Sequence, residues 1–171
     1  MSTAADPLAE ARASFIAGWG ALGSAWGVSK TMAMTHALLL ISDESLSTDE
    51  VMAELGVSRG NANTTLRELV GWGLVRKVVR LGERREYFEA EKDVWTIFCT
   101  VARERKRREI EPALALLEAC LAQTKGLRGA KSFHAKLAEL TEFVQLANGI
   151  LDRIASSERS KVIPAILKWL K

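Results

Sequence analysis

The chain has 171 residues, of which 48% are apolar and 26% are charged, and its formal net charge is +3. This length fits one domain, or one small domain with an appendage, and the apolar fraction excludes a disordered protein. The N-terminus lacks the basic start of a signal peptide, and no apolar stretch is long enough to cross a membrane. Two cysteines without a CxxC pair indicate a reducing compartment, so we expect a cytoplasmic protein.

Two helices are predicted in the first 41 residues. Asp6 precedes Pro7 as an N-cap would, and apolar residues then recur at steps of three and four as far as Trp26. Three glycines weaken this helix and predict a bend or an end near Gly27. A second helix, apolar enough to be mostly buried, is predicted over Lys30–Ile41.

The segment 46–71 predicts two short helices joined by a tight turn. Ser47 and Glu50 have the spacing of a capping box, and Gly56 stands where a left-handed residue would end the first helix. Ser58 then begins a second helix that ends around Gly71. Two helices joined by a short turn that contains glycine are typical of a helix-turn-helix.

A β-hairpin is predicted directly after this pair of helices. Residues 74–80 are rich in apolar and β-branched side chains, and a second short run begins at Tyr87. Between the two runs, the segment LGER contains the glycine that a hairpin turn needs. The hairpin is therefore interpreted as a two-stranded β-wing.

The rest of the chain is predicted to be helical. A long helix follows Asp93 and is kinked or restarted at Pro112. Its middle, RERKRRE, is interpreted as a solvated face, with contact to DNA as the alternative. A last helix is predicted over Ser160–Leu170. Between Pro112 and Ser160, a series of apolar residues is spaced alternately four and three positions apart, which is typical of a helix–helix seam. These residues are Phe133, Leu137, Leu140, Val144, Ala147, Leu151 and Ile154.

Together these elements predict a mostly α-helical fold, a winged helix-turn-helix domain with a two-stranded β-wing, flanked by N-terminal and C-terminal dimerisation helices. The expected parts are an N-terminal helix in residues 1–28, a DNA-binding domain in residues 29–92, and a dimerisation or effector region in residues 93–171. The seam and the first helix predict an interface that contains Phe15, Trp19, Leu137, Leu140, Val144 and Leu151.

The second helix of the pair begins with poor helix formers. Its apolar residues, Ala62, Leu66, Leu69 and Val70, define one side and leave small, hydrogen-bonding residues on the other. Small residues let a recognition helix approach base edges, which Asn, Arg and Thr can read, and the helix start suits a phosphate. We predict that double-stranded DNA contacts Ser58, Arg59, Gly60, Asn61, Asn63, Thr64, Arg67, Arg80, Arg84 and Arg85.

Positive charge is concentrated in the same segment. From Ser58 to Arg85, seven basic residues stand against two glutamates, and the resulting +5 exceeds the +3 of the whole chain. Localised positive charge is typical of proteins that bind the nucleic-acid backbone. A polar helix face is also ordinary on a solvated helix, so the alternative is a protein-interaction module without sequence-specific DNA binding.

No catalytic or metal-binding motif is found in the sequence. His36 and His134 lack a second ligand at metal spacing, and no nucleophile elbow, P-loop or HExxH motif occurs. We therefore expect no enzyme activity, no metal and no cofactor. Cys99 and Cys120 are expected to pack as small apolar residues, with a redox switch as the alternative.

Two runs in the middle of the chain have a familiar pattern. SRGNANTTLRELVGWGLV at residues 58–75 is followed by GERREYFEAE at residues 82–91 and then by DVW. Residues 46–98 resemble the GbsR branch of the MarR-type winged-helix regulators. The resemblance implies a bacterial or archaeal transcriptional repressor that is dimeric through its terminal helices and binds a palindromic operator. It places the wing tip at Arg84 and Arg85, and the recognition helix at Ser58, Arg59, Asn61, Asn63, Thr64 and Arg67.

The resemblance also implies a small-molecule effector. Some members of this group sense choline or related osmoprotectants, and a quaternary ammonium needs an aromatic cage. The aromatic residues available for a cage are Trp19, Trp26, Trp95, Phe98, Phe133 and Phe143, with packing in the core as their alternative role. The sequence does not identify the effector.

Overall fold

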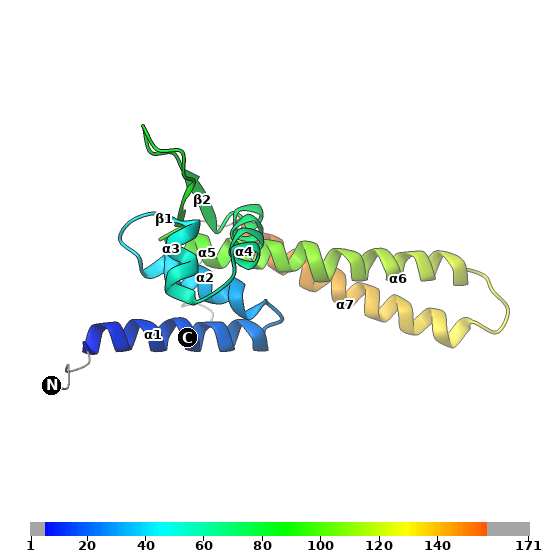
Figure 1. Ribbon diagram of the computed structural model, residues 1–171. Helices are drawn as coiled ribbons and strands as arrows, with labels where there is room; N and C mark the ends of the chain where they lie inside the picture. Colours follow the sequence, from blue (N-terminus) through cyan, green and yellow to red (C-terminus); the bar gives the residue numbers. More distant parts are fainter. Residues whose placement is uncertain (1–5, 157–171) are drawn as a thin grey trace. The chain divides into compact units, whose positions relative to one another are not determined.

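The computed structural model describes residues 6–156, and the chain divides into two units between Val94 and Trp95 (Figure 1). The first unit holds the predicted N-terminal helix together with the predicted winged helix-turn-helix. The second unit is helical. The helix predicted over Ser160–Leu170 lies outside the described residues. Within residues 6–156, no helix is long and apolar enough to cross a membrane.

The first two helices lie where the sequence predicts them. α1 (Pro7–Ala25) begins after Asp6, whose carboxylate accepts a hydrogen bond from the backbone N of Leu8 at 3.0 Å. α2 (Lys30–Ile41) begins after Ser29, which caps the helix in the same way. The end predicted near Gly27 is confirmed, since α1 stops at Ala25 and Gly27 has a φ of +76°.

Glycines allow α1 and α2 to approach each other closely. A Cβ atom on Gly23 would lie 2.4 Å from the Cβ of Ala33, and one on Gly20 would lie 2.5 Å from the Cγ of Met34. Gly18, in contrast, has nothing within 4 Å of its Cβ position. Positions 20 and 23 therefore lose helix propensity but gain a close helix–helix contact, and α1 continues through them.

The predicted helix-turn-helix consists of α3 (Thr48–Leu55) and α4 (Arg59–Trp72). The capping box is confirmed, because the Oγ of Ser47 accepts a hydrogen bond from the backbone N of Glu50 at 3.3 Å. In return, the backbone N and the Oγ of Ser47 both donate to Oε2 of Glu50 at 2.6 Å. These two hydrogen bonds hold the pKa of the Glu50 carboxyl below its ordinary value. Gly56, between the helices, has the predicted left-handed conformation with a φ of +62°.

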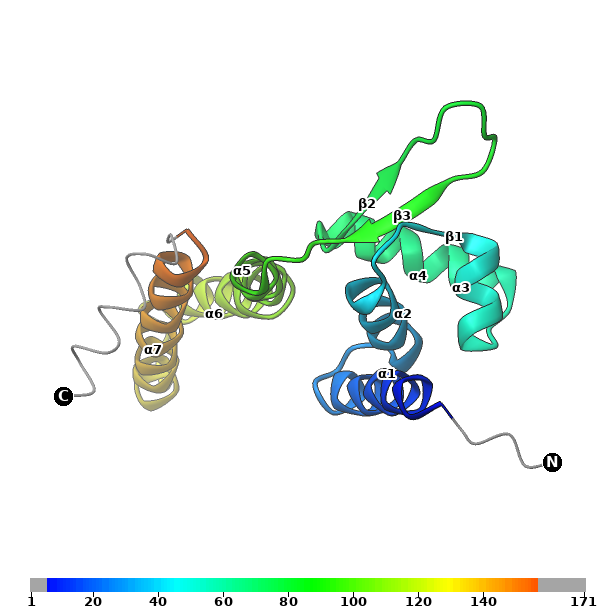
Figure 2. The same cartoon turned by 90° about the vertical axis from the view of Figure 1, so that its left-hand side faces the viewer.

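A small antiparallel sheet follows the two helices (Figure 2). β2 (Val75–Val78) and β3 (Tyr87–Ala90) form the predicted hairpin. The loop of residues 79–86, which connects them, extends beyond the sheet. A third strand, β1 (Leu46–Ser47), pairs with β3 on the other side, so the order is β1-β3-β2. A strand of two residues has no periodicity, and the sequence therefore did not predict it.

The core of the first unit lies between α2, α3, α4 and the sheet. Its largest fully buried apolar side chains are Leu39, Val51, Leu66 and Leu69. They come from three different helices, so the core fixes the position of α4 within the first unit.

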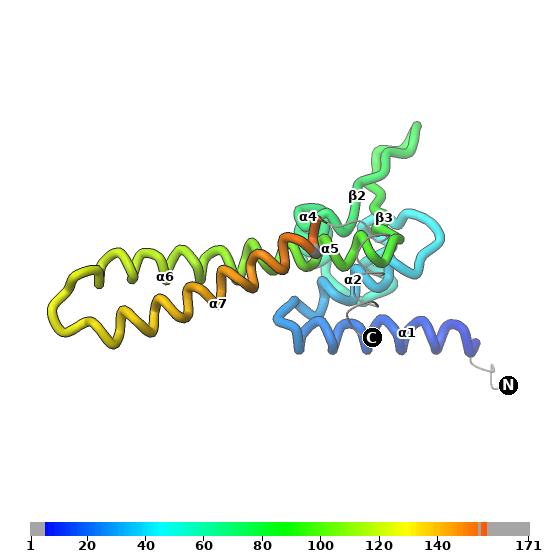
Figure 3. Tube along the Cα trace, turned by 180° about the vertical axis from the view of Figure 1, so that it is seen from behind, coloured from blue at the N-terminus to red at the C-terminus, as the bar shows by residue number. Residues whose placement is uncertain are grey.

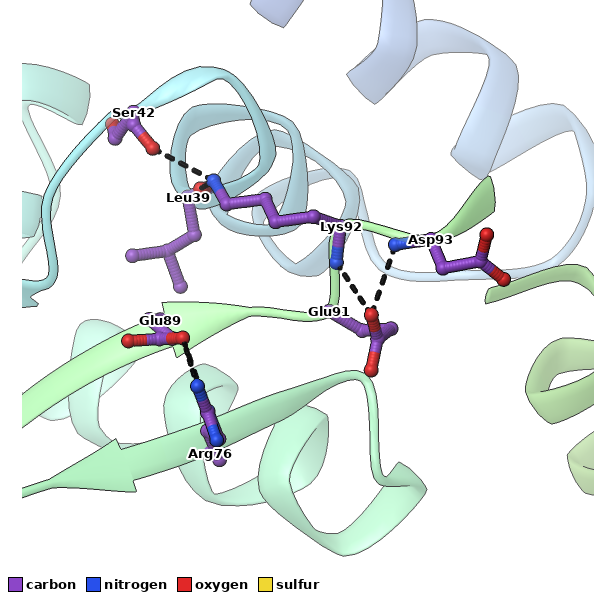
Figure 4. A network of polar contacts seen from close by, with 7 residues as sticks. All are labelled: Leu39, Ser42, Arg76, Glu89, Glu91, Lys92 and Asp93. Atoms are coloured by element: carbon purple, nitrogen blue, oxygen red, sulfur yellow. Dashed lines mark hydrogen bonds and ion pairs between the residues drawn. The ribbon is translucent and has the colours of Figure 1, made fainter. Parts of the chain in front are cut away.

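Lys92 connects the end of β3 to the end of α2 (Figure 4). Its Nζ donates to the carbonyl oxygens of Leu39, Leu40 and Ser42 at 2.8, 2.8 and 2.7 Å. A helix leaves its last carbonyls unpaired, and Lys92 supplies charged donors to this end of α2. His36 is buried in the same helix, and burial together with the charge of Lys92 lowers its pKa to about 4.

The second unit is built on a helical hairpin (Figure 3). α5 (Val94–Arg105), the π-helical turn η1 (Lys106–Ile110) and α6 (Glu111–Thr124) follow one another without a break. α7 (Lys131–Ala155) then runs back alongside α6 and η1. Pro112, where the sequence predicts a kink or a restart, lies in the first turn of α6, directly after the π-helical turn.

The RERKRRE run forms ion pairs within the second unit. Glu104 is buried and pairs with Arg107 at 2.7 Å and with Arg108 at 3.5 Å. Lys106 pairs with Asp152 of α7 at 2.7 Å and with Glu111 at 3.4 Å. These pairs support a structural role for the run, in preference to contact with DNA.

The apolar repeat predicted in α7 lies along the border between two faces. Leu137 is buried, and Val144 and Leu151 are half-buried, on the side where His134 contacts Thr124 of α6 at 2.8 Å. The adjoining face is exposed and carries Phe133, Leu140, Phe143, Leu146 and Ile150. The helix therefore has one apolar face within the hairpin and another that the described residues leave uncovered.

Candidate nucleic-acid interface

The outer face of α4 is polar and exposed, as the sequence predicts. Ala62, Leu66 and Leu69 are buried, whereas Gly60, Thr64 and Arg67 are exposed. Val70 is half-buried, and Thr65 is buried although the sequence analysis gave it no inward position. The buried residues pack against the core, and this packing compensates for the weak helix propensity of the first turns of α4.

Two of the predicted DNA contacts on α4 are engaged within the protein. The amide of Asn61 donates to Oγ1 of Thr31 in α2 at 3.3 Å and accepts from Thr65 at 3.4 Å. Arg59 forms an ion pair with Asp49 of α3. Both interactions fix the start of α4 against its neighbours. Asn63, Thr64 and Arg67 make no side-chain hydrogen bond within residues 6–156, so their polar groups are available to a ligand.

Arg80 fixes the base of the wing. Its Nη2 donates to the backbone oxygen and to the Oγ of Ser45, both at 3.0 Å, and its guanidinium lies 3.9 Å from the centre of the Tyr87 ring. It also pairs with Glu44 at 3.5 Å. Arg80 is predicted from the sequence to contact DNA, and its anchoring role was not predicted. A signal was available, because Arg80 lies two residues after Val78, the partner of Tyr87 in the sheet, and long side chains reach diagonal neighbours across a hairpin.

Two ion pairs connect the two sides of the wing. Arg76 pairs with Glu89 and Lys77 with Glu86 across the hairpin. The hydroxyl of Tyr87 donates to Glu83, and this hydrogen bond raises the pKa of Tyr87. The net charge of +5 refers to residues 58–85. It therefore does not include Glu86 and Glu89, which neutralise Lys77 and Arg76.

The arginines that remain unpaired among the predicted DNA contacts lie on α4 and at the wing tip. Of the five arginines predicted to contact DNA, Arg67, Arg84 and Arg85 form no side-chain hydrogen bond or ion pair with the described part of the chain. All three are exposed. Such arginines carry no internal partner that would have to be displaced when a phosphate or a base binds.

These features define a winged helix-turn-helix. The second helix of the pair presents a polar outer face, and Arg80 anchors the base of the hairpin. The hairpin follows this helix directly (Figures 1 and 2). A solved structure described as "Crystal Structure of a transcriptional regulator" has the same fold, with a TM-score of 0.69 and 20% identity. That similarity covers 85% of this chain and 95% of the other.

Among proteins of known function, the chain is similar to the HTH-type transcriptional repressor GbsR of Bacillus subtilis (strain 168). The two are 25% identical over 93 residues, which is 54% of this chain. The aligned segment spans about half of the repressor's length, 51%. No family model matches the chain. Both similarities support the resemblance to GbsR/MarR-type regulators that the sequence suggests.

A groove of about 680 Å³ lies in the first unit among α1, α2, α3 and the loop of residues 42–46. Its floor is apolar, with Ile16, Leu38 and Leu55, and its acidic groups include Asp43 and Glu44. No aromatic side chain of the described residues lines it. The aromatic residues considered for a cage do not contribute to this groove; Trp19 instead contacts Phe15, and Trp95 contacts Phe98, each at 5.5 Å between ring centres.

The cysteines and potential metal ligands complete the inventory of reactive groups. Cys99 is buried and Cys120 is half-buried, and neither forms a disulfide within the described residues. Within residues 6–156, no group of three or more His, Cys, Asp or Glu side chains is placed to hold a metal ion.

Proposed function

We propose that this protein is a transcriptional regulator that binds DNA sequence-specifically. The observation that carries the proposal is the placement of unpaired arginines on α4 and on the wing tip, next to small polar residues. Arg76 and Lys77 of the wing are neutralised by glutamates, whereas the arginines at these positions have no such partner among the described residues. The similarity to a curated repressor supports repression as the mode of regulation.

The residues divide into readers, phosphate contacts and positioning residues. Arg67, Asn63 and Thr64 read base edges in the major groove, where Arg suits guanine and Asn suits adenine. Gly60 lets the helix backbone come close to the bases. The phosphate backbone is contacted by Ser58 at the start of α4 and by Arg84 and Arg85 at the wing tip. Arg59, Asn61 and Arg80 position α4 and the wing through the internal contacts described above.

A homodimer on a palindromic operator is the second part of the proposal. Two uncovered apolar surfaces support it, since contiguous exposed apolar surface commonly marks an interaction site. One surface is on α1 and contains Leu8, Phe15, Trp19, Leu22 and Trp26; the other is the exposed face of α7. A two-fold axis would place the two α4 helices about 34 Å apart, one turn of DNA.

A small-molecule effector would act through the groove beside α1. Glu44, one of the groove's carboxylates, pairs with Arg80 at the base of the wing. A ligand that displaces the loop of residues 42–46 would therefore also displace the anchor of the wing. This connection supports release of DNA by an effector and does not identify the effector.

Selection from a random DNA library tests the proposal. The full-length protein is mixed with the library at moderate salt, bound DNA is amplified over several rounds, and the enriched site is footprinted. We expect a two-fold symmetric site with half-sites about one DNA turn apart. If no sequence is enriched and no DNA is retained, the proposal fails and a winged-helix module for protein interaction becomes the better interpretation.

A further inference from the structure

The wing tip carries two apolar side chains that the proposed function does not use. Val79 is 88% exposed and Leu81 is 100% exposed. Among the other large apolar side chains whose exposure the structure describes, the most exposed is Val94 at 72%. Single exposed apolar residues are ordinary on protein surfaces, but two of them beside two free arginines on one projecting loop form a distinct surface. We call Val79, Leu81, Arg84 and Arg85 the wing-tip cluster.

The backbone of the loop directs Leu81 outward. Arg80 points toward Ser45 and Tyr87, and successive side chains of an extended segment alternate in direction, so Val79 faces the other way. The backbone N of Glu83 donates to the oxygen of Arg80 at 3.2 Å and closes a turn. Gly82 has a φ of +85°, as the third residue of a type II turn requires, which leaves Leu81 at the second position.

The glutamates of the loop are bound to neighbouring side chains and do not neutralise the arginines of the tip. Glu83 is held by the hydroxyl of Tyr87 and Glu86 is held by Lys77. Arg84 and Arg85 have no such partner in the described chain. The wing-tip cluster therefore combines an apolar projection with two arginines that form no ion pair or side-chain hydrogen bond within the described residues.

We propose that Leu81 inserts into the minor groove of the operator and partly unstacks a base step beside the sequence read by α4, bending the DNA. Val79 packs against the sugars, and Arg84 and Arg85 bind the adjacent phosphates. This inference rests on the proposed DNA-binding function. DNA is the occupant that the cluster fits, because apolar wedges flanked by basic residues act in this way in the minor groove, where the potential is negative.

The shape of the DNA in the complex tests this proposal. The selected operator carries a donor dye at one end and an acceptor at the other, and energy transfer is measured at saturating protein. The wild-type protein is expected to shorten the end-to-end distance. Leu81→Ser should leave the DNA straighter and lower the affinity about tenfold, whereas Leu81→Met should retain the bend because it keeps an apolar wedge. Leu127→Ser, at a 62% exposed leucine between α6 and α7, is the matched control and should bend DNA like the wild type.

The sequence dependence provides a second readout. A flexible TA step at the position of the wing is replaced by a stiffer AA step. Wild-type affinity should fall, and the affinity of Leu81→Ser should change much less, because that variant no longer deforms the step. Thermal unfolding by circular dichroism verifies that both serine variants are folded.

The possible results separate this inference from the proposed function. If the wild type binds the operator without bending it, or if Leu81→Ser bends it equally well, insertion is contradicted while DNA binding stands. A loss of affinity with an unchanged bend would also contradict insertion. If the wild type binds no DNA, the proposed function itself fails, and the apolar tip is then assigned to a protein partner.

Discussion

His36 illustrates how burial sets the charge of a single residue. It is 5% exposed, its Nε2 has no hydrogen-bond partner within the described residues, and its pKa is about 4 instead of the ordinary 6.5. Below pH 6.5 the unfolded chain takes up a proton that the folded chain refuses until about pH 4. The stability that neutral His36 contributes is therefore complete above pH 6.5 and is lost as the pH falls to about 4, by about 3 kcal/mol in total.

His36→Leu should flatten this part of the stability profile. The measurement is the free energy of unfolding in urea, at intervals from pH 7 to pH 4, for the variant and the wild type. His134→Gln serves as the control, because His134 is the other histidine of the chain. An identical decline in the wild type and in His36→Leu would show that His36 is not the group responsible.

Lysine substitutions at Arg80 and Arg84 distinguish anchoring of the wing from contact with phosphate. Arg80→Lys keeps the charge but loses the two hydrogen bonds to Ser45 and the flat contact with Tyr87. It should weaken operator binding about three- to tenfold by releasing the wing, whereas Arg84→Lys should bind nearly as well as the wild type, since Lys also serves as a phosphate contact. Titration of labelled operator by fluorescence anisotropy measures both. Equal affinities for the two lysine variants would argue against the anchoring role.

The exposed face of α4 could be predicted from the sequence, but the internal partners of the candidate residues could not. Small polar residues opposite an apolar stripe indicate the outer face of α4 without any tertiary information. The partners of Arg59, Asn61 and Arg80 come from α3, α2 and the loop before β1. Such contacts depend on how elements pack, and residue spacing within one element does not reveal them.

At the scale of elements, the contact between α1 and α2 depends on glycine. Gly23→Ala would place a methyl group 2.4 Å from the Cβ of Ala33, so the helices must move apart. We expect the unfolding free energy to fall by about 1–3 kcal/mol, as for other overpacked sites. Thermal and urea unfolding measure the change.

Gly18→Ala is the matched control in the same helix. Its Cβ would meet nothing within 4 Å, and replacing glycine by alanine in a helix interior should raise stability by about 0.5–1 kcal/mol. Opposite signs for the two substitutions would support the close contact. A stabilising effect at both positions would contradict it.

The elements were predicted well where the sequence carries local signals. Asp6, the capping box at Ser47 and the cap at Ser58 indicated where α1, α3 and α4 begin, and Gly27 and Gly56 indicated where α1 and α3 end. β1 and η1 were not predicted, because the first is too short for a pattern and the second is a local change of helix winding. The seven-residue repeat of α7 indicated which residues form its apolar side. It could not show which of them pack against α6 and which remain exposed.

At the scale of the whole molecule, the exposed face of α7 should mediate dimerisation. Phe143 is 69% exposed, so Phe143→Glu should leave the fold of a single chain intact while placing a charge in the interface. We expect a monomer in sedimentation velocity and a loss of at least about tenfold in affinity for a two-half-site operator, because simultaneous binding of two half-sites is lost.

Gln145→Glu adds the same charge on α7 without removing an apolar side chain, and it controls for electrostatic repulsion by DNA. This variant should sediment as the wild type does. A dimer that persists in Phe143→Glu would exclude this face from the interface and would direct attention to the apolar surface of α1.

The claim that the outer face of α4 reads DNA bases is tested most directly by Arg67→Ala. Its affinity is measured on the selected operator and on a scrambled duplex at several salt concentrations, with Arg128→Ala, an exposed arginine of the α6–α7 turn, as control. The expected result is a loss of about 10- to 100-fold on the operator, little change on scrambled DNA, and no effect of Arg128→Ala. Equal losses on both DNAs, or no loss on the operator, would contradict base reading by this helix.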